Sequence, residues 1–325
     1  MNAHAIRYDW TLAEVEAVLA LPFYELVDRA RQVHRTHHDP GEVQLATLSN
    51  IKKGGCPEDC GYCPQAARYH TGVKGEPLLD LEVVREQANR AKAAGATRFC
   101  MGAAWRSVRD GPAFDRVVEM VRVVSDLNME ACVTLGMLKP HQIARLRDAG
   151  LTAYNHNLDT SREHYGEVIT TRDYDDRLQT LQNVRDAGVQ VCCGGIIGLG
   201  ESTGDRAALL HTLATMQPHP ESVPINKLVQ APGTPLEGAQ EVDVFDWLRV
   251  IAAARILMPQ AKVRLAAGRS SLSREGRALA LLCGANSIFY GEELLTTPNP
   301  SSDEDAELLA VLGMRPMAAQ VRPDA

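Results

Sequence analysis

The chain has 325 residues and carries 34 lysine and arginine against 41 aspartate and glutamate side chains, a formal charge of −7. Hydrophobic residues make up 45 % and charged residues 23 %, which is enough apolar material for a sizeable core and excludes a largely disordered chain. The acidic balance, without a lysine- or arginine-rich tract, argues against nucleic-acid and anionic-membrane partners. No segment approaches the ~18 apolar residues that cross a bilayer, and no secretion signal is visible, so we expect no membrane association and a cytoplasmic location.

The N-terminal segment, residues 1–40, predicts a helical extension. Thr11 and Glu14 have the spacing of a capping box, and apolar residues after them recur on one helical face. Three histidines lie near its end: His34, His37 and His38. Because this stretch is polar and a proline follows it, we favour a solvated helix end over a metal site.

From residue 45 onward, strand-length apolar runs alternate with amphipathic segments of helical period. The predicted strands are Leu45–Ile51, Thr97–Ala103, Glu130–Leu135, Ala153–Leu158, Val189–Ile197, Ser222–Val229, Lys262–Ala266 and Ser287–Tyr290. The predicted helices are Leu81–Ala93, Phe114–Leu127, His141–Ala149, Arg177–Ala187, Asp205–Met216, Val244–Leu257 and Arg274–Leu282.

This alternation is typical of βαβ units and a parallel sheet, which makes the chain an α/β protein. Eight units in roughly 250 residues favour a (β/α)8 TIM-type barrel, with a doubly wound open sheet as the alternative. We place the barrel at residues 41–297 and a short, loosely packed C-terminal tail at residues 298–325.

The chain has eight cysteines, and a reducing compartment makes disulfides a poor explanation for them. Cys56, Cys60 and Cys63 form a CxxxCxxC pattern in the loop after the first strand, at the mouth where barrel enzymes place their chemistry. Soft thiolates at this spacing select zinc or an iron–sulfur cluster. A structural zinc site needs a fourth ligand, usually from a second CxxC pair, and the chain has none. Three thiolates therefore leave one metal position open for a cofactor or substrate.

Three polar residues, Asn155, Asn157 and Asp159, alternate along the predicted fourth strand and should share one face. If that face points into the barrel, a ligand with hydroxyl and amide groups supplies the partners that buried polar groups need. The alternative is a solvated outer face.

Cys100, Cys132 and Cys192 each fall within a different predicted strand. Each is either a small buried hydrophobe or one of a group that converges inside the barrel. Cys193 should point the opposite way from Cys192. Arg264 lies in the middle of a strand, where its all-donor chemistry favours a salt bridge or a substrate anchor over metal ligation.

The segment from Gly194 to Glu201 ends the predicted fifth strand with several glycines. Their spacing is not that of a dinucleotide-binding fingerprint. They either let the backbone approach a ligand closely or form a tight turn into the next helix.

The CxxxCxxC pattern with an aromatic residue before the last cysteine resembles the signature of the radical S-adenosylmethionine (SAM) enzymes. The resemblance implies a 4Fe-4S cluster held by Cys56, Cys60 and Cys63, whose open iron binds SAM. One electron then cleaves SAM to methionine and a 5′-deoxyadenosyl radical, which abstracts an unactivated hydrogen, so the cofactor and not an acid–base residue carries the chemistry.

Longer stretches resemble the biotin synthase family across roughly residues 40–315. They are CPEDCGYCPQ (56–65), TRFCMGAAWR (97–106), YNHNLDTS (154–161), VCCGGIIGLGE (191–201), ESVPINKLV (221–229), VRLAAGR (263–269) and GANSIFYGEELLTTPNP (284–300). The resemblance implies a second, 2Fe-2S cluster held by Cys100, Cys132, Cys192 and Arg264, which overrides the interpretation of Arg264 from its chemistry alone. The cysteine at position 193, where related chains carry a small hydroxyl residue, leaves open whether Cys192 or Cys193 is the ligand.

The same resemblance assigns binding residues. Those implied to contact SAM are Asn157, Asp159, Arg177, Gly194, Ile196, Gly198 and Glu201. Those implied to contact dethiobiotin are Asn157 and Asn226 at its ureido ring, and Thr296 and Thr297 at its carboxylate.

The activity implied by the resemblance is the conversion of dethiobiotin to biotin, the last step of biotin biosynthesis, by sulfur insertion at C6 and C9. The 2Fe-2S cluster would be the sulfur donor and would be consumed. The family is a homodimer that takes electrons from a flavodoxin or ferredoxin. Two alternatives remain: a related radical SAM enzyme for another small molecule and, from another class, an iron–sulfur electron carrier or binding protein.

Overall fold

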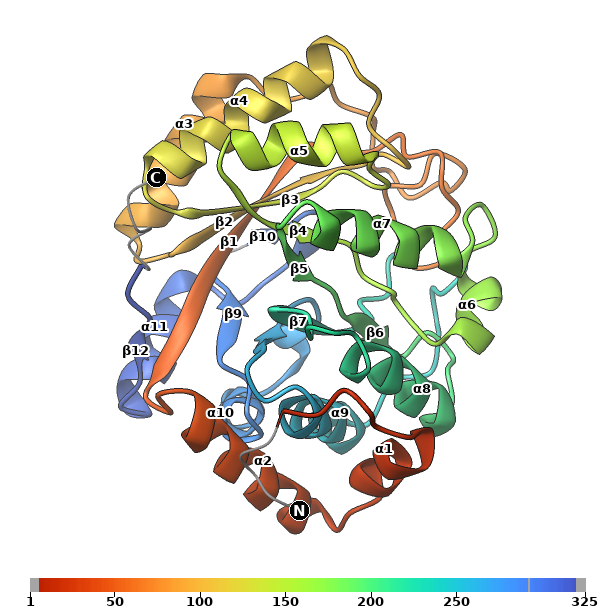
Figure 1. Cartoon of the computed structure of the whole chain (residues 1–325), viewed down its shortest axis with the longest axis vertical. Coiled ribbons are helices and arrows are strands. Elements are labelled where there is room, and N and C mark those ends of the chain that lie inside the picture. Colours follow the sequence, from red (N-terminus) through yellow and green to blue (C-terminus); the bar gives the residue numbers. More distant parts are fainter. Residues whose placement is uncertain (1–5, 292, 320–325) are drawn as a thin grey trace.

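A closed ring of parallel strands forms the centre of the computed structural model, which describes residues 6–291 and 293–319. The ring order is β1-β2-β3-β4-β5-β7-β8-β9, β6 pairs with β7, and β1 pairs with β9 to close the barrel (Figure 1). The bounds are β1 Glu42–Lys52, β2 Arg98–Ala103, β3 Glu130–Thr134, β4 Leu151–Asn155, β5 Gln190–Cys192, β6 Gly195–Ile197, β7 Ser222–Lys227, β8 Lys262–Leu265 and β9 Ser287–Phe289.

Helices cover the outside of this ring (Figure 1). They are α3 Leu81–Ala93, α4 Pro112–Asp126, α5 Pro140–Asp148, α6 Arg162–Val168, α7 Tyr174–Asp186, α8 Thr203–Ala214, α9 Val244–Leu257 and α10 Arg274–Leu282. The predicted (β/α)8 TIM-type barrel is therefore confirmed, and the open sheet is excluded.

Because side chains alternate along each strand, one face packs against the helices in the apolar core and the other faces the inside of the barrel. Phe99 and Met101 of β2 and Val133 of β3 point outward and are fully buried under the helices. Burying a side chain of this size contributes about 1.5–3 kcal/mol, so the apolar face fixes each strand's orientation. The intervening residues of the same strands, among them Cys100 and Cys132, consequently face the barrel interior.

Two strands differ most from the sequence prediction. The predicted fourth strand extends to Leu158, whereas β4 ends at Asn155. The predicted continuous fifth strand is divided into β5 and β6 at Cys193 and Gly194. A Cβ atom on Gly194 would lie 1.9 Å from the carbonyl oxygen of Pro224, so the chain approaches β7 too closely there for a regular ladder.

The N-terminal extension forms α1 (Leu12–Leu19) and α2 (Phe23–His37). The predicted capping box is confirmed, because the Thr11 side chain accepts from the Glu14 backbone and the Glu14 carboxylate accepts from the Thr11 backbone. The two helices pack against α8 and α9, at the bottom of the view in Figure 1.

The prediction of a solvated histidine end is wrong. His34 is only 5 % exposed, and Nε2 of His38 lies 2.8 Å from Nη1 of Arg255 on α9. The sequence of α2 contains no sign of this, because the burial depends on a helix more than two hundred residues further along the chain.

The C-terminal tail is more ordered than predicted. It contains α11 (Ser302–Val311) and β12 (Arg315–Pro316), which extends the sheet beside the start of β1, and it is preceded by the hairpin of β10 (Glu293–Leu294) and β11 (Thr297–Pro298). Asp305 of α11 forms a buried ion pair of 2.7 Å with Arg269 in the short 3-10 helix Arg269–Ser271. None of the helices in the described part of the chain is long and apolar enough to cross a membrane.

The buried histidines make stability depend on pH. Burial, and then the charge of Arg255, lowers the pKa of His34 to about 4 and that of His38 to about 3. Histidines of the unfolded chain titrate near 6.5, so the folded state binds fewer protons, and stability present above pH ~6.5 is lost as the pH falls toward 4. Between about pH 7.5 and about pH 5, the wild type should lose roughly 2 kcal/mol more than a His34→Leu variant, measured by urea unfolding.

The matched control is His141→Gln, which changes an exposed histidine. This control should lose as much stability as the wild type over the same pH interval. An equal loss in His34→Leu would contradict the prediction.

Candidate functional site

The barrel encloses a cavity of about 310 Å³ at the carboxyl ends of its strands. Most of the site residues singled out from the sequence line it together: Cys63, Cys100, Cys132, Asn157, Asp159, Arg177, Cys192, Ile196, Asn226, Arg264, Thr296 and Thr297. The remainder are not among its lining residues: Cys56, Cys60, Gly194, Gly198 and Glu201. Elements from all around the barrel thus converge on one space.

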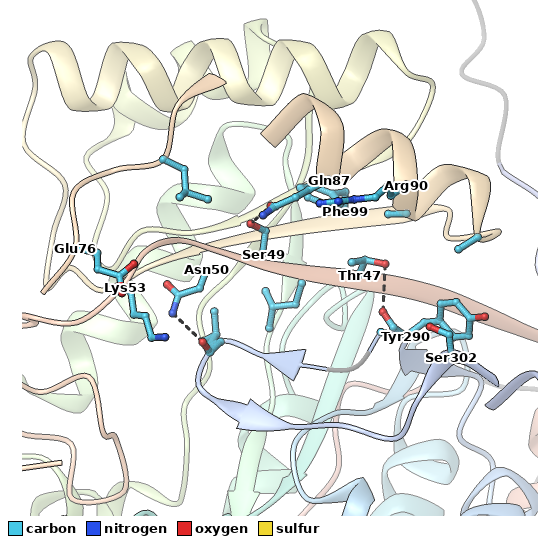
Figure 2. A pocket seen from close by; sticks show the side chains of 16 residues that line it. Thr47, Ser49, Asn50, Lys53, Glu76, Gln87, Arg90, Phe99, Tyr290 and Ser302 are labelled. Atoms are coloured by element: carbon cyan, nitrogen blue, oxygen red, sulfur yellow. Dashed lines mark hydrogen bonds between the residues drawn. The ribbon is translucent and has the colours of Figure 1, made fainter. Parts of the chain in front are cut away.

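A second hollow, of about 480 Å³, lies on the outer face of β1 (Figure 2). Its walls carry Thr47 and Ser49 of β1 and Gln87 and Arg90 of α3, and none of the predicted site residues lines it. Of these two spaces in the described part of the chain, the interior cavity is the one that combines thiols with the predicted binding residues.

The carboxylate of Asp59 fixes the loop with the first three cysteines to residues 170–171. Asp59 accepts hydrogen bonds from the backbone N–H groups of Thr170 (2.9 Å) and Thr171 (3.1 Å), and also from both of their hydroxyls. Burial would raise the pKa of Asp59, but these hydrogen bonds outweigh it and lower the pKa to about 2. On the other side of Cys60, the N–H of Gly61 donates to the carbonyl of Val168 over 2.9 Å.

Burial disfavours the thiolate form of all three cysteines in this loop. Burial raises the pKa of Cys60 to about 12 and that of Cys63 to about 11, and it also raises the pKa of Cys56. None of the three forms a disulfide. A bound metal supplies the positive charge that stabilises such thiolates, so the donor set fits an iron–sulfur cluster.

Next to this loop lies a buried ion pair. Asp159 Oδ2 accepts from Arg177 Nη2 over 2.5 Å and from the Tyr62 hydroxyl over 2.8 Å. Burial would lower the pKa of Arg177, but the charge of Asp159 outweighs it and raises the pKa. Arg177 also donates to the Tyr165 hydroxyl (2.7 Å) and to the Asn157 carbonyl. The pair fixes a carboxylate and a guanidinium at the cavity wall beside Cys63.

The segment that carries Asp159 reaches the cavity in another way than predicted. Since β4 ends at Asn155, strand alternation does not place the later residues, and Asp159 adopts a left-handed backbone (φ 69°). Asn155, Asn157 and Asp159 nevertheless all line the cavity, which agrees with the interior alternative. His156, which alternates with these three residues along the chain, lines it as well.

Deeper in the barrel, three further thiols meet. Cys100 and Cys132 are direct neighbours in the register of β2 and β3, and the thiol of Cys132 interacts with those of both Cys100 and Cys192. These interactions raise the pKa of Cys132 and lower those of its two partners. The sequence left open whether these cysteines are separate core residues or one group, and the structure shows one group.

Arg264 completes this group and has no carboxylate partner among its contacts in the described chain. Nη1 lies 3.8 Å from the sulfur of Cys192, while Nε donates to Ser287 (2.9 Å) and Nη2 donates to Gln44 (3.0 Å). The salt bridge suggested by residue chemistry is therefore wrong, and the guanidinium is aimed at the thiols by two neutral acceptors. Asn155 Nδ2 also donates to the Cys192 sulfur, over 3.3 Å.

The remaining two cysteines belong to the apolar core. Cys193 and Cys283 are fully buried in it and line neither cavity. Burial raises the pKa of both thiols, that of Cys283 to about 12. The predicted orientation of Cys193 away from the cavity is confirmed.

In the described part of the chain, no group of three His, Cys, Asp or Glu side chains is arranged so that it could hold a single metal ion.

The glycine-rich segment packs mainly against protein. Both carboxylate oxygens of Glu201 accept from the N–H of Gly198 (2.9 and 3.0 Å), and Arg206 pairs with Glu201 over 2.8 Å. Only Ile196 of this segment lines the cavity. The tight-turn interpretation thus accounts for Gly198 and Glu201.

Sequence reasoning missed several lining residues, among them Trp105 and Arg172. Trp105 lies within the stretch TRFCMGAAWR (97–106) without being part of a recognised spacing, and Arg172 lies outside every quoted stretch. Tyr62 lies within the CxxxCxxC pattern, but only the folded chain shows that its hydroxyl holds Asp159.

Comparison with known proteins agrees with this geometry. Residues 51–213 match the "Radical SAM superfamily" and residues 224–315 match the "Biotin and Thiamin Synthesis associated domain". The first match contains the CxxxCxxC loop and defines the chain as a radical SAM enzyme, a class that uses a 4Fe-4S cluster and SAM.

Close relatives specify the family further. The chain is 60 % identical over 312 residues to the biotin synthase of Myxococcus xanthus, covering 96 % of this chain and 90 % of the relative. It is 61 % identical over 311 residues to that of Methylobacterium radiotolerans, covering 95 % and 92 %. The chain belongs to the biotin synthase family, which decides against the electron-carrier alternative.

Solved structures show the same fold at lower identity. Methylornithine synthase (PylB) superposes with a TM-score of 0.79 at 19 % identity and covers 95 % of this chain and 94 % of its own. The hydrogenase maturase HydG superposes with a TM-score of 0.79 at 18 % identity and covers 94 % of this chain and 72 % of its own.

Close packing at Gly194 gives a prediction for the site. Gly194→Ala would force a Cβ against the Pro224 carbonyl and displace Asn157, whose side-chain oxygen accepts from the Gly194 N–H over 3.2 Å. We expect about 1–3 kcal/mol of lost stability in urea unfolding, together with weaker SAM binding in equilibrium dialysis. The control is Gly166→Ala in α6, where a Cβ meets nothing within 4 Å. Equal behaviour of the two variants would refute the packing argument.

Proposed function

We propose that the interior cavity converts dethiobiotin to biotin with two iron–sulfur clusters, one at each end of the space. The observation that carries the proposal is the lining itself. Cys63 of the loop lines one part, the group of Cys100, Cys132, Cys192 and Arg264 lines another, and polar residues stand between them. A radical generated at one thiol set and a sulfur atom held at the other can then meet at one small molecule.

Cys56, Cys60 and Cys63 are proposed as the ligands of the 4Fe-4S cluster. When bound, this cluster supplies the electron that cleaves SAM into methionine and the radical that abstracts hydrogen. The protein's part is to orient SAM. Asp159 and Arg177 present a carboxylate and a guanidinium beside Cys63, which suits the ribose hydroxyls and the carboxylate of SAM. Asn157 and Ile196 line the adjoining wall, and Gly194, Gly198 and Glu201 shape the turn behind it.

Asn157 and Asn226 are proposed to hold the ureido ring. The side-chain oxygen of Asn157 accepts from the Gly194 N–H, and no partner for its Nδ2 is found in the described chain, so Nδ2 is available to donate to a ureido carbonyl. Asn226 is held rigidly, because it donates to the Gly195 carbonyl and accepts from the Ala267 N–H, each over 3.0 Å. Thr296 and Thr297 offer hydroxyls for the carboxylate tail at the rim of the same cavity.

The second thiol group is proposed to hold the 2Fe-2S cluster, with Cys100, Cys132, Cys192 and Arg264 as its four ligands. When bound, this cluster supplies the sulfur atoms of biotin. The chain buries all four residues, which are at most 5 % exposed, so solvent does not compete for the sulfur. Cys192 and not Cys193 is the ligand, because only Cys192 faces the cavity.

Several further assignments accompany the proposal. The enzyme is a cytoplasmic homodimer that receives electrons from a flavodoxin or ferredoxin. Its chain divides into an N-terminal extension at residues 1–40, the barrel at residues 41–297 and a C-terminal tail at residues 298–325.

Cysteine variants test the two assignments separately. After anaerobic reconstitution, the wild type should hold about six iron atoms per chain and Cys132→Ala about four. Cys132→Ala should still cleave SAM but form no biotin, whereas Cys60→Ala should lose SAM cleavage as well. Iron analysis and the parallel assay of 5′-deoxyadenosine and biotin measure this.

Cys193→Ala is the matched control, because it removes a buried thiol beside Cys192 that faces the core. It should keep both clusters and both products. Biotin formation by Cys132→Ala, or loss of the second cluster in Cys193→Ala, would overturn the assignment.

A further inference from the structure

Each proposed ligand of the second cluster has a polar residue two positions before it on the same strand. The pairs are Arg98 and Cys100, Glu130 and Cys132, Gln190 and Cys192, and Lys262 and Arg264. Side chains at i and i+2 point to the same side of a strand, so the four earlier residues lie one step closer to the amino-terminal mouth of the barrel. We call Arg98, Glu130, Gln190 and Lys262 the N-terminal floor.

The floor is an ionic layer where barrels usually have branched apolar side chains. Glu130 accepts from Arg98 Nε over 2.6 Å, from Lys262 Nζ over 3.2 Å and from Gln44 Nε2 over 3.0 Å. Long polar side chains change rotamer more readily than a packed apolar layer does. The layer can therefore open without unfolding the barrel.

The floor is also thin. The side chains of Glu130 and Lys262 are 14 % and 17 % exposed, and Gln190 is exposed, whereas Cys132 and Cys192 are each 1 % exposed. One layer of side chains thus separates the second thiol group from solvent at this mouth. At the opposite mouth, by the proposed function, SAM and dethiobiotin lie between the same thiols and solvent.

The charge of the floor favours an anion. It holds two cations, Arg98 and Lys262, against the single carboxylate of Glu130, with Arg264 as a third cation directly above. Arg98 is 1 % exposed, and its Nη1 has no hydrogen-bond partner among the residues that the structure describes. Besides Glu130, the thiols of Cys132, Cys192 and Cys100 lie close enough to act on its charge. A buried N–H without an acceptor is costly, so the position suits an acceptor that arrives from outside.

We propose that the N-terminal floor is a second entrance to the barrel, through which inorganic sulfide reaches the second thiol group as the hydrosulfide anion, with Arg98 Nη1 as its binding group. The proposal rests on the proposed function, in which the sulfur of the second cluster is consumed and must be replaced. The step is passage and binding of an ion, and no covalent bond changes in it. It lets the cluster be rebuilt while the opposite mouth remains occupied.

The experiment follows the rebuilding of the second cluster in a chain that retains only the first. Ferric iron is loaded first under anaerobic conditions, and sulfide is then added with and without SAM and dethiobiotin. No electron donor is present, so turnover does not occur. Ferric iron and sulfide form the oxidised 2Fe-2S cluster without any net redox change. The rate of recovery of its visible absorbance, checked by Mössbauer spectroscopy, should stay within about twofold when SAM and dethiobiotin occupy their mouth.

Floor variants give the second readout. Gln190→Trp covers the entrance with a bulky ring and should slow rebuilding at least about tenfold, whereas Gln182→Trp on the exposed face of α7 should not. Lys262→Met should slow rebuilding several-fold and weaken its dependence on salt, and Lys262→Arg should restore both. In Arg98→Met, the rebuilding rate should saturate only at a higher sulfide concentration than in the wild type. Arg98→Lys should recover part of this difference.

The outcomes separate the two proposals. If wild-type chain forms no second cluster at all, the proposed function fails and this inference falls with it. If the second cluster forms but SAM and dethiobiotin stop its rebuilding, or if Gln190→Trp and Lys262→Met rebuild at the rate of Gln182→Trp, only the entrance is refuted. A variant that still binds the first cluster has a folded barrel. The proposal is therefore judged on the variants that bind the first cluster.

Discussion

The pairing of β1 with β9 closes the sheet into a barrel, and the position of every functional side chain depends on that closure. In a closed parallel ring, each strand has one face toward the helices and one toward the interior. Apolar residues such as Phe99 and Val133 fix the outer face, so the thiols of Cys100 and Cys132 can only point inward. The same closure brings Cys63 of the CxxxCxxC loop to the wall of the cavity that Cys100, Cys132 and Cys192 also line.

Two buried arginines, Arg177 and Arg264, differ in the partners that hold them. Arg177 lies beside the loop thiols with Asp159 as its partner, whereas Arg264 lies beside the deeper thiols with only neutral acceptors. A guanidinium paired to a carboxylate is fully engaged, while one held by Ser287 and Gln44 keeps a nitrogen directed at sulfur. This difference in partners accounts for the two roles proposed for the two arginines, one in binding SAM and one beside the cluster that donates sulfur.

Much of the fold and of the site could be predicted from the sequence because the signals are periodic or closely spaced. Alternating strands and helices predicted the barrel, and α3, α9 and α10 have the predicted bounds. The features that were not predicted depend on contacts between residues far apart in the sequence. The break at Gly194 is set by a carbonyl of β7, the burial of His34 by the packing of α2 on α9, and the partners of Arg264 by Gln44 at the other end of the chain. Helix α6 was missed since its short sequence lacks an apolar period, although its Ser161 cap is plain in the structure.

The most direct test of the account asks where the sulfur of biotin comes from. The second cluster is rebuilt with sulfide of a heavy sulfur isotope, free sulfide is removed, and a single turnover is run with SAM, dethiobiotin and a reductant. The account predicts that biotin carries the heavy isotope, and that the iron bound at Cys100, Cys132 and Cys192 loses its 2Fe-2S Mössbauer signal in step with product. Biotin of natural isotopic composition, or biotin formed while that signal persists unchanged, would contradict it.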